Sequence, residues 1–240
     1  MNTDRIVAIT GGAGALGSAL AGHLVSEGYR VAILDTERSK DRVTQLVDKL
    51  SAERAVGHVG DFATAATWDA ALAVITRAFG GAPTHGALIA GGWAGGTPLH
   101  AAKDDAAYEQ MMSQNVGTAY RALRALLPAM VAASHGSIVL VGSRVVERPW
   151  TSAGAAAYAA SKAAVVAMAQ AAAKEVLEQG VRINAVLPST MDTPANRASM
   201  PDVDPAKWVS LESASSVIAF LLSEGARDVS GAALPVYGRA

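Results

Sequence analysis

The chain has 240 residues, of which 51% are hydrophobic and 17% are charged, so it can form one large domain around a sizeable core. Its 20 Lys and Arg residues balance 21 Asp and Glu residues, and the resulting net charge of −1 argues against a nucleic-acid-binding surface. The absence of cysteine excludes disulfides, thiolate nucleophiles and cysteine-ligated metal centres.

Short β-branched runs alternate with helical patterns along the whole chain. Most of the runs are continuously apolar, as expected for strands of a parallel sheet that is covered on both faces. The predicted strands are Arg5–Thr10, Arg30–Asp35, Ala55–Gly60, Gly86–Gly91, Gly136–Gly142, Val181–Leu187 and Ala232–Val236. The predicted helices are one marked by Leu16, Leu20 and Leu24, which stops at Gly28, and segments near 39–52, 64–79, 104–133, 155–179 and 211–224. This alternation predicts an α/β fold in which residues 1–240 form a single domain around a doubly wound, Rossmann-type parallel sheet.

No segment is suited to export or to a membrane. The apolar run Ile6–Ile9 is too short for a signal peptide, and the apolar stretch Ala153–Ala173 is interrupted by polar residues. We therefore expect a cytoplasmic protein with no membrane partner. The one long irregular stretch, Pro188–Ala206, is rich in proline and predicts a functional lid or a disordered loop. We assign residues 188–208 to a substrate loop.

A glycine-rich turn links the first predicted strand to the first predicted helix. Gly12, Gly14 and Gly17 satisfy the spacing G-x-G-x-x-G in the strand–turn–helix context of dinucleotide-binding sites. Missing Cβ atoms let the backbone approach a pyrophosphate, whose charge would face the amides and the positive dipole at the helix N-terminus. A glycine-rich turn without a ligand is the alternative. The expected cofactor contacts in this turn are Gly11, Gly14, Ala15, Leu16 and Gly17.

Acidic residues follow the second and third predicted strands. The Asp35 carboxylate can accept hydrogen bonds from both adenosine ribose hydroxyls and would repel a 2′-phosphate. Neither position 36 nor the glycine turn carries Arg or Lys, so the sequence favours NAD(H) over NADP(H), with Arg38 as the nearby cation. Helix N-capping is the alternative role of Asp35. Asp61 can accept from an adenine amino group or cap the next helix.

Tyr158 and Lys162 are spaced i, i+4 in the alanine-rich helix after the fifth predicted strand, so both side chains lie on one helical face. A free tyrosine has a pKa of about 10, and a neighbouring ammonium group is expected to lower the pKa of Tyr158 toward the range useful in acid–base catalysis. Ser143, at the end of the fifth strand, lies where a parallel sheet presents groups to its ligand crevice. Its hydroxyl could hold the substrate oxygen. A Tyr–Lys pair on a solvated helix face is the alternative.

With these motifs, the chain resembles the short-chain dehydrogenase/reductase family over nearly its whole length. The family's Tyr-x-x-x-Lys motif falls on Tyr158 and Lys162, its serine on Ser143 and its asparagine on Asn115. The resemblance implies that Tyr158 is the general acid/base and that Lys162 holds the nicotinamide ribose and tunes Tyr158. It implies that Ser143 orients the reacting oxygen and that Asn115 anchors a water-linked proton path to Lys162. Further cofactor contacts implied in this way are Ala90, Gly91, Pro188 and Thr193.

Three features depart from the family pattern. Ala15 stands where a glycine is usual and adds a methyl group near the pyrophosphate. Residues 90–92, Ala-Gly-Gly, stand where the family has Asn-Asn-Ala-Gly, so the support for the sheet and for the adenosine ribose must differ. The spacing between Ser143 and Tyr158 is slightly longer than usual.

A narrower resemblance points to quinonoid dihydropteridine reductases. It is carried by residues 11–17, 90–96 and 187–197, and by Ser199-Met200-Pro201 with Trp208 downstream. Those enzymes, as the resemblance implies, use NADH and Tyr-x-x-x-Lys but lack the serine. This chain carries Ser143 and Asn115, which a carbonyl or alcohol substrate needs and a pterin imine does not.

The sequence therefore predicts an NAD(H)-dependent short-chain oxidoreductase that interconverts a small carbonyl compound and its alcohol. A pterin reductase is the alternative enzyme, and a non-catalytic NAD-sensing or scaffold protein is a third hypothesis, which the retained catalytic motif disfavours. The five histidines show no pair at metal-ligand spacing, so no metal is predicted. The family resemblance implies a homodimer or homotetramer that packs through the helices at 104–133 and 155–179.

Overall fold

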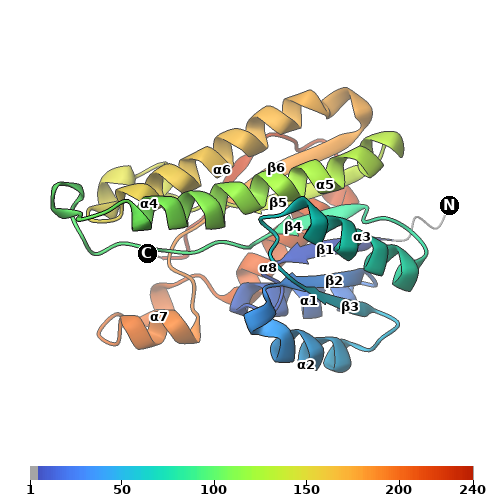
Figure 1. The fold of residues 1–240 in the computed structure, drawn as a ribbon, viewed down its shortest axis with the longest axis horizontal. Helices are drawn as coiled ribbons and strands as arrows, with labels where there is room; N and C mark the ends of the chain where they lie inside the picture. The colour runs from blue at the N-terminus through green and yellow to red at the C-terminus, as the bar shows by residue number, and fades with distance from the viewer. Residues whose placement is uncertain (1–4, 240) are drawn as a thin grey trace.

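In the computed structural model, which describes residues 5–239, the seven apolar runs pair as strands of one parallel sheet (Figure 1). The strand order is β3-β2-β1-β4-β5-β6-β7. The strands are β1 (Ile6–Thr10), β2 (Arg30–Asp35), β3 (Ala55–Val59), β4 (His85–Leu88), β5 (Gly136–Val141), β6 (Val181–Pro188) and β7 (Ala233–Val236). Parallel pairing places all the carboxyl ends at one edge, and the strand order reverses between β1 and β4, where doubly wound sheets bind ligands. The predicted doubly wound α/β fold is confirmed.

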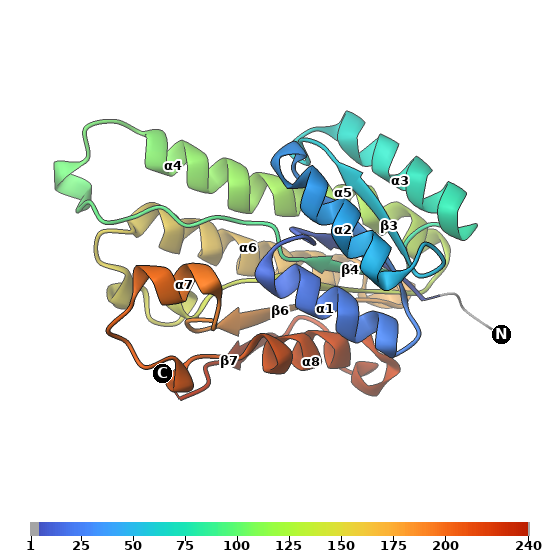
Figure 2. The ribbon, with the colours of Figure 1, turned by 90° about the horizontal axis from the view of Figure 1, so that it is seen from below.

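The helices cover both faces of the sheet (Figure 1 and Figure 2). α1, α2 and α8 pack on one face, and α3, α5 and α6 pack on the other, each layer with its own cluster of buried Ala, Val, Leu and Ile side chains. The helices are α1 (Ala15–Ser26), α2 (Lys40–Leu50), α3 (Ala65–Phe79), α4 (Ala106–Met111), α5 (Thr118–Ala132), α6 (Ala156–Glu175), α7 (Pro194–Ser199) and α8 (Leu211–Leu222). None of the helices within residues 5–239 is long and apolar enough to cross a membrane.

Two of the differences from the predicted bounds concern Asn115. β4 ends at Leu88 instead of Gly91, because backbone amides beyond it donate to side chains instead of to a neighbouring strand. Ala90 donates to Thr10 Oγ1 at 3.2 Å, and Gly92 donates to Asn115 Oδ1 at 2.8 Å. The segment predicted as one helix over 104–133 consists of α4 and α5, joined by a π-helical turn over Met112–Gly117 (Figure 2). Asn115 lies in that turn.

The proline-rich segment after β6 contains a short helix where the sequence predicts an irregular stretch. The Thr193 hydroxyl accepts from the Asn196 amide at 3.1 Å, and Pro194 begins α7 with a backbone torsion already suited to a helix. Met191 forms an isolated parallel bridge with Val209, which closes the base of this segment. Residues 188–208 therefore leave and rejoin the fold at the carboxyl edge of the sheet.

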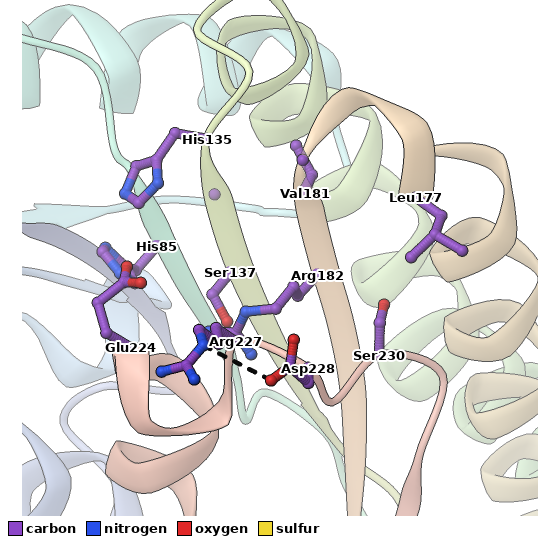
Figure 3. Close-up of a pocket in the computed structure, with 12 residues that line it drawn as sticks. His85, His135, Ser137, Leu177, Val181, Arg182, Glu224, Arg227, Asp228 and Ser230 are labelled. Atoms are coloured by element: carbon purple, nitrogen blue, oxygen red, sulfur yellow. Dashed lines mark ion pairs between the residues drawn. The ribbon is translucent and has the colours of Figure 1, made fainter.

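The opposite, amino edge of the sheet is used for structural hydrogen bonds. Arg182, near the start of β6, donates to the carbonyls of Leu221 at 2.8 Å, Leu222 at 3.3 Å and Ser223 at 3.0 Å. The last carbonyls of a helix lack partners within the helix, so this guanidinium caps the end of α8. Arg182 also borders a cavity of ≈ 340 Å³, together with His85 and other residues from the strand starts and the loop before β7 (Figure 3). The motif residues lie at the other edge.

Candidate active site

The packing of the protein itself requires most of the glycines in the turn after β1. A Cβ atom on Gly17 would lie 2.3 Å from the Gly11 carbonyl oxygen, and one on Gly12 would lie 2.9 Å from the Ile9 carbonyl oxygen. Gly11 has a φ of +66°, and a Cβ there would approach the Ala90 amide nitrogen to 3.0 Å. At Gly14 a Cβ would meet only the Gly11 carbonyl oxygen, at 3.1 Å. Three of the glycines therefore let α1 and the turn pack closely against β1, β2 and the segment that follows β4.

Asp35 joins this turn to the end of β2. Its Oδ2 accepts from the Ala13 amide at 3.0 Å, and its Oδ1 accepts from the Thr36 amide at 2.8 Å. The N-cap of the short helix that follows is Thr36, not Asp35, so the helix-capping alternative is wrong. The half-buried carboxylate is instead placed beside the glycine turn.

These groups fit a dinucleotide. The N-cap of α1 is Gly14, which offers no side-chain acceptor to the amides of the first turn. Those amides suit a pyrophosphate, and the carboxylate at the end of β2 suits a ribose. Leu16 is buried against the core, so only its backbone faces the turn, and Ala15 begins the helix.

Asp61 has a local structural partner. Its Oδ1 accepts from the Ala63 amide at 2.9 Å, and the hydroxyl of Thr64 caps α3 by accepting from Thr67. Asp61 therefore shapes the turn before α3 without being its N-cap. Its side chain is exposed, and the contact with adenine stays a prediction.

The catalytic motif lies where α6 passes the carboxyl end of β5. Ser143 follows β5, and its Oγ accepts from the Val145 amide at 3.4 Å. The Ser143 hydroxyl also lies near enough to the Tyr158 phenol to lower the pKa of that phenol. Lys162, one helical turn beyond Tyr158, is buried and donates from Nζ to the Val141 carbonyl at 2.9 Å. The three predicted side chains therefore form one group at the end of β5, and the alternative of a solvated Tyr–Lys pair is wrong.

The pKa of Tyr158 moves in the direction opposite to the sequence-based expectation. Burial raises it above the ordinary value, and the Ser143 hydroxyl offsets part of this rise. Burial also lowers the pKa of Lys162 to about 8, so this side chain is charged at neutral pH. The ammonium donates to the Val141 carbonyl, and the pKa of Tyr158 is set by burial and by Ser143.

Asn115 connects α4 and α5 to the end of β4. Its Oδ1 accepts from the Gly92 amide at 2.8 Å, and its Nδ2 donates to the Gly92 carbonyl at 3.2 Å. The same Nδ2 donates to Ser161 Oγ at 2.8 Å, and Ser161 donates to the Tyr158 carbonyl at 2.8 Å. Asn115 thus replaces the sheet support that the Ala-Gly-Gly run lacks. Its side chain is fully engaged by protein groups, and its part in a water-linked proton path stays a prediction.

The remaining predicted cofactor contacts lie at the same edge. A Cβ atom on Gly91 would lie 2.6 Å from Asn115 Oδ1 and 3.3 Å from Lys162 Nζ, so glycine is needed there for the two polar groups to approach. Pro188 ends β6 opposite Val236. Thr193 caps α7. The places of these residues agree with the predicted crevice, and their contacts with a nicotinamide stay predictions.

Two residues of this group were not found from the sequence alone. Ser161 precedes Lys162 and orients Asn115, and Thr10 accepts from the Ala90 amide beside the glycine turn. The sequence carries no signal for Ser161, because the burial that makes its hydroxyl need a partner appears only in the fold. Among the described residues no three His, Cys, Asp or Glu side chains form a group that could hold a metal.

A cavity of ≈ 500 Å³ lies beside the start of α6. Its walls are the loop after β4, the beginning of α4 and residues 154–157, which directly precede Tyr158. The Gly96 amide donates to the Gly154 carbonyl at 2.9 Å and holds the two loops together. This cavity provides space for a small molecule next to the helix that carries the phenol.

Comparison with known proteins identifies related chains. The model of the short chain dehydrogenase family matches residues 5–204. A 2,5-dichloro-2,5-cyclohexadiene-1,4-diol dehydrogenase of Sphingobium indicum is 31% identical, over 98% of this chain and 95% of that protein. The solved structure of an oxidoreductase of the short chain dehydrogenase/reductase family from Burkholderia thailandensis is 31% identical with a TM-score of 0.85, over 99% of this chain and 92% of that one. A 3-oxoacyl-(acyl-carrier-protein) reductase with bound NAD from Brucella melitensis is 26% identical with a TM-score of 0.84, over 99% and 91%.

The lowered pKa of Lys162 predicts how stability depends on pH. Between about pH 8 and 10.5 the unfolded chain binds more protons at this lysine than the native chain, so the free energy of unfolding contributed by Lys162 rises with pH. In urea unfolding, the free energy of unfolding of the wild type should therefore rise relative to that of Lys162→Met across this window, by up to about 1.4 kcal/mol per pH unit.

Lys174→Met, on the exposed side of the same helix, is the matched control and should give a flat difference. If the difference in the free energy of unfolding between the wild type and Lys162→Met were flat or fell with pH, the lowered pKa assigned to Lys162 would be wrong.

Proposed function

Because the chain belongs to the short-chain dehydrogenase family, we propose that this oxidoreductase uses NAD(H) to interconvert a small carbonyl compound and its alcohol. One observation carries the proposal: the Tyr158 phenol meets the Ser143 hydroxyl at the carboxyl edge, and the buried Lys162 ammonium lies one helical turn away. This edge also holds the glycine turn and Asp35. The proposal explains why a buried charge, a buried hydroxyl and a crowded glycine turn occur together.

The side chains have separate roles in this proposal. The nicotinamide, when bound, supplies or accepts the hydride. Tyr158 donates its phenolic proton to the carbonyl oxygen during reduction and takes it back during oxidation. Ser143 donates a hydrogen bond to the same oxygen and holds it near the phenol. Lys162 is charged at neutral pH and stabilises the phenolate that proton donation leaves.

The raised pKa of Tyr158 keeps the phenol protonated but makes it a weaker acid, so proton donation needs the Lys162 ammonium to stabilise the phenolate. Burial keeps the phenol protonated at neutral pH, which is the form that reduction requires. Oxidation requires the phenolate, so the proposed enzyme should oxidise alcohols faster as the pH rises. This difference between the pH dependence of reduction and that of oxidation follows from the raised pKa of Tyr158. It applies to any substrate that presents a carbonyl or hydroxyl oxygen to Tyr158 and Ser143.

For the cofactor, we propose NAD(H) instead of NADP(H). The Asp35 carboxylate lies beside the glycine turn, and a 2′-phosphate placed there would be repelled by it. The similar Brucella melitensis reductase whose structure contains NAD supports a nicotinamide cofactor of this kind. Residues 188–208, closed at their base by the Met191–Val209 bridge, are the proposed substrate loop.

No observation favours the pterin reductase or the non-catalytic alternative. Ser143 and Asn115 are held in the active-site group by hydrogen bonds, although a pterin imine would not need them. The relatives named above are dehydrogenases and reductases, and none of them is named as a pterin reductase.

Tyr158→Phe tests the proposed chemistry. The variant lacks the proton donor, so kcat for NADH-dependent reduction should fall by about 10²-fold or more, while NADH binding measured by fluorescence stays unchanged. The assay follows nicotinamide absorbance with a panel of sugars, steroids, 3-oxoacyl thioesters and a quinonoid dihydropterin.

Turnover of Tyr158→Phe at the wild-type rate would overturn the proposed function. Ser143→Ala separates the two enzyme hypotheses, because it should slow carbonyl reduction strongly, whereas full activity of this variant with the dihydropterin would favour the pterin reductase.

Asp35→Ala tests the cofactor. Removing the carboxylate removes the repulsion of a 2′-phosphate and the acceptor for the ribose, so the ratio of the Kd values for NADPH and NADH should fall by about tenfold. Asp61→Ala, at an exposed carboxylate after the next strand, should change the two Kd values equally. Tighter binding of NADPH than of NADH by the wild type would show that the role proposed for Asp35 is wrong.

The proposed oligomer packs through α4, α5 and α6. These helices lie side by side on one face of the molecule (Figure 1), and Tyr108 and Tyr120 on α4 and α5 are 55% and 56% exposed. Light scattering should give a mass of two or four chains of 24.4 kDa. Tyr120→Glu should shift the mass toward the monomer, because a buried unpaired charge is strongly unfavourable. A monomeric wild type would overturn this part of the proposal.

A further inference from the structure

The C-terminal tail, residues 237–239, contacts three segments of the carboxyl edge. The Tyr237 carbonyl accepts from Ser189 Oγ at 2.7 Å, directly after β6. The Arg239 amide donates to the Lys207 carbonyl at 3.0 Å, near the end of the proposed substrate loop. The Tyr237 hydroxyl donates to the Glu147 carboxylate, in the loop after β5.

The Glu147 contact reaches the loop that begins with Ser143. Ser143 caps a single helical turn over residues 144–146, and the Glu147 amide donates to the Arg144 carbonyl at 3.1 Å at the end of that turn. Arg148 lies over the Tyr237 ring, with its guanidinium carbon 5.9 Å from the ring centroid. The far end of the turn is therefore attached to the tail, and the near end carries the hydroxyl that meets Tyr158.

The Tyr237 hydroxyl is well suited to remain the donor in this contact. Burial and the hydrogen bond to Glu147 raise the pKa of Tyr237 to about 12, so the phenol stays protonated over the range in which the enzyme would work. The ring packs against the same core cluster as Val146 of the turn. Of the described residues, Glu147 is the partner that the structure gives to this hydroxyl.

We propose that Tyr237 is a positioning residue for the reaction: through Glu147 it holds the turn of residues 144–147 and thereby sets the place of the Ser143 hydroxyl. The inference rests on the proposed function. The turn packs against α6 and β6, and among the described residues its hydrogen bond to a distant segment is the one between Glu147 and Tyr237, so the tail supplies the polar support at its far end. Loss of this support lets Ser143 drift from the geometry that oxygen binding requires, and small displacements of this kind slow catalysis strongly.

Tyr237→Phe removes only the hydroxyl and leaves the ring, the Arg148 contact and the backbone bonds. We expect hydrogen exchange of the amides in residues 144–148 to become several times faster, and kcat for the best carbonyl substrate of the panel to fall by about tenfold. The Kd for NADH and the melting temperature should stay close to the wild-type values, because the glycine turn and the core are untouched. Glu147→Gln keeps an acceptor oxygen and should retain most of the activity.

Three further variants test the positioning role of Tyr237. Glu147→Ala should behave like Tyr237→Phe, and the double variant should be no slower than either single variant, because both remove one contact. Thr44→Ala deletes an exposed hydroxyl on α2 and should change neither exchange nor kcat. Unchanged exchange in Tyr237→Phe would overturn the inference, and so would faster exchange with wild-type kcat.

Failure of the proposed function would be recognised separately. If Tyr158→Phe turned over at the wild-type rate, the oxidoreductase chemistry would be wrong whatever Tyr237→Phe does. If Tyr158→Phe were inactive and Tyr237→Phe fully active, the proposed function would stand and only the positioning role of Tyr237 would fall.

Discussion

The hydrogen bond from the Lys162 ammonium to the Val141 carbonyl is the contact around which the site is built. A buried charge is strongly unfavourable unless polar groups meet it, and here β5 supplies an acceptor at its carboxyl end. The same ammonium needs Gly91 beside it, because a Cβ at that position would lie 3.3 Å from Nζ. The end of β4, the end of β5 and the first half of α6 are thereby brought to one place. Tyr158 lies on the face of α6 that this contact directs toward the sheet edge.

The two edges of the parallel sheet are used differently. At the amino edge, Arg182 satisfies the final carbonyls of α8, and its charge serves the attachment of a helix. At the carboxyl edge, the first-turn amides of α1 meet no side-chain cap, and the phenol of Tyr158 is partly exposed. Polar groups that make no hydrogen bonds within the protein's own secondary structure remain available to a ligand, and here they lie at the carboxyl edge. Asp35 has two roles, because its carboxylate accepts a hydrogen bond from the glycine turn and also lies beside that turn, where a ligand could reach it.

Several parts of the site follow from spacing, and others do not. Tyr158 and Lys162 share a face because any helix places residues i and i+4 together, and Ser143 reaches them because parallel strands end at one edge. The direction of the Tyr158 pKa does not follow from spacing, because it depends on how deeply the phenol is buried. The end of β4 at Leu88 depends on Asn115, a residue from a π-helical turn that the periodicity of the chain does not reveal. Glu147 and Tyr237 are far apart in sequence, and neither belongs to a motif.

By itself, the amino-acid sequence determined the doubly wound sheet, the glycine turn and the Tyr–Lys face, because each depends on apolar periodicity or on residues a few positions apart. Tertiary structure alone decided which groups meet across distant segments: the Asn115 amide with Gly92, the Asp35 carboxylate with the glycine turn, and the C-terminal tail with the loop after β5. Such contacts arise when the sheet closes and brings strand ends together. Burial is likewise a property of the assembled layers, so the directions in which the pKa values of Tyr158 and Lys162 shift are decided only in the folded chain.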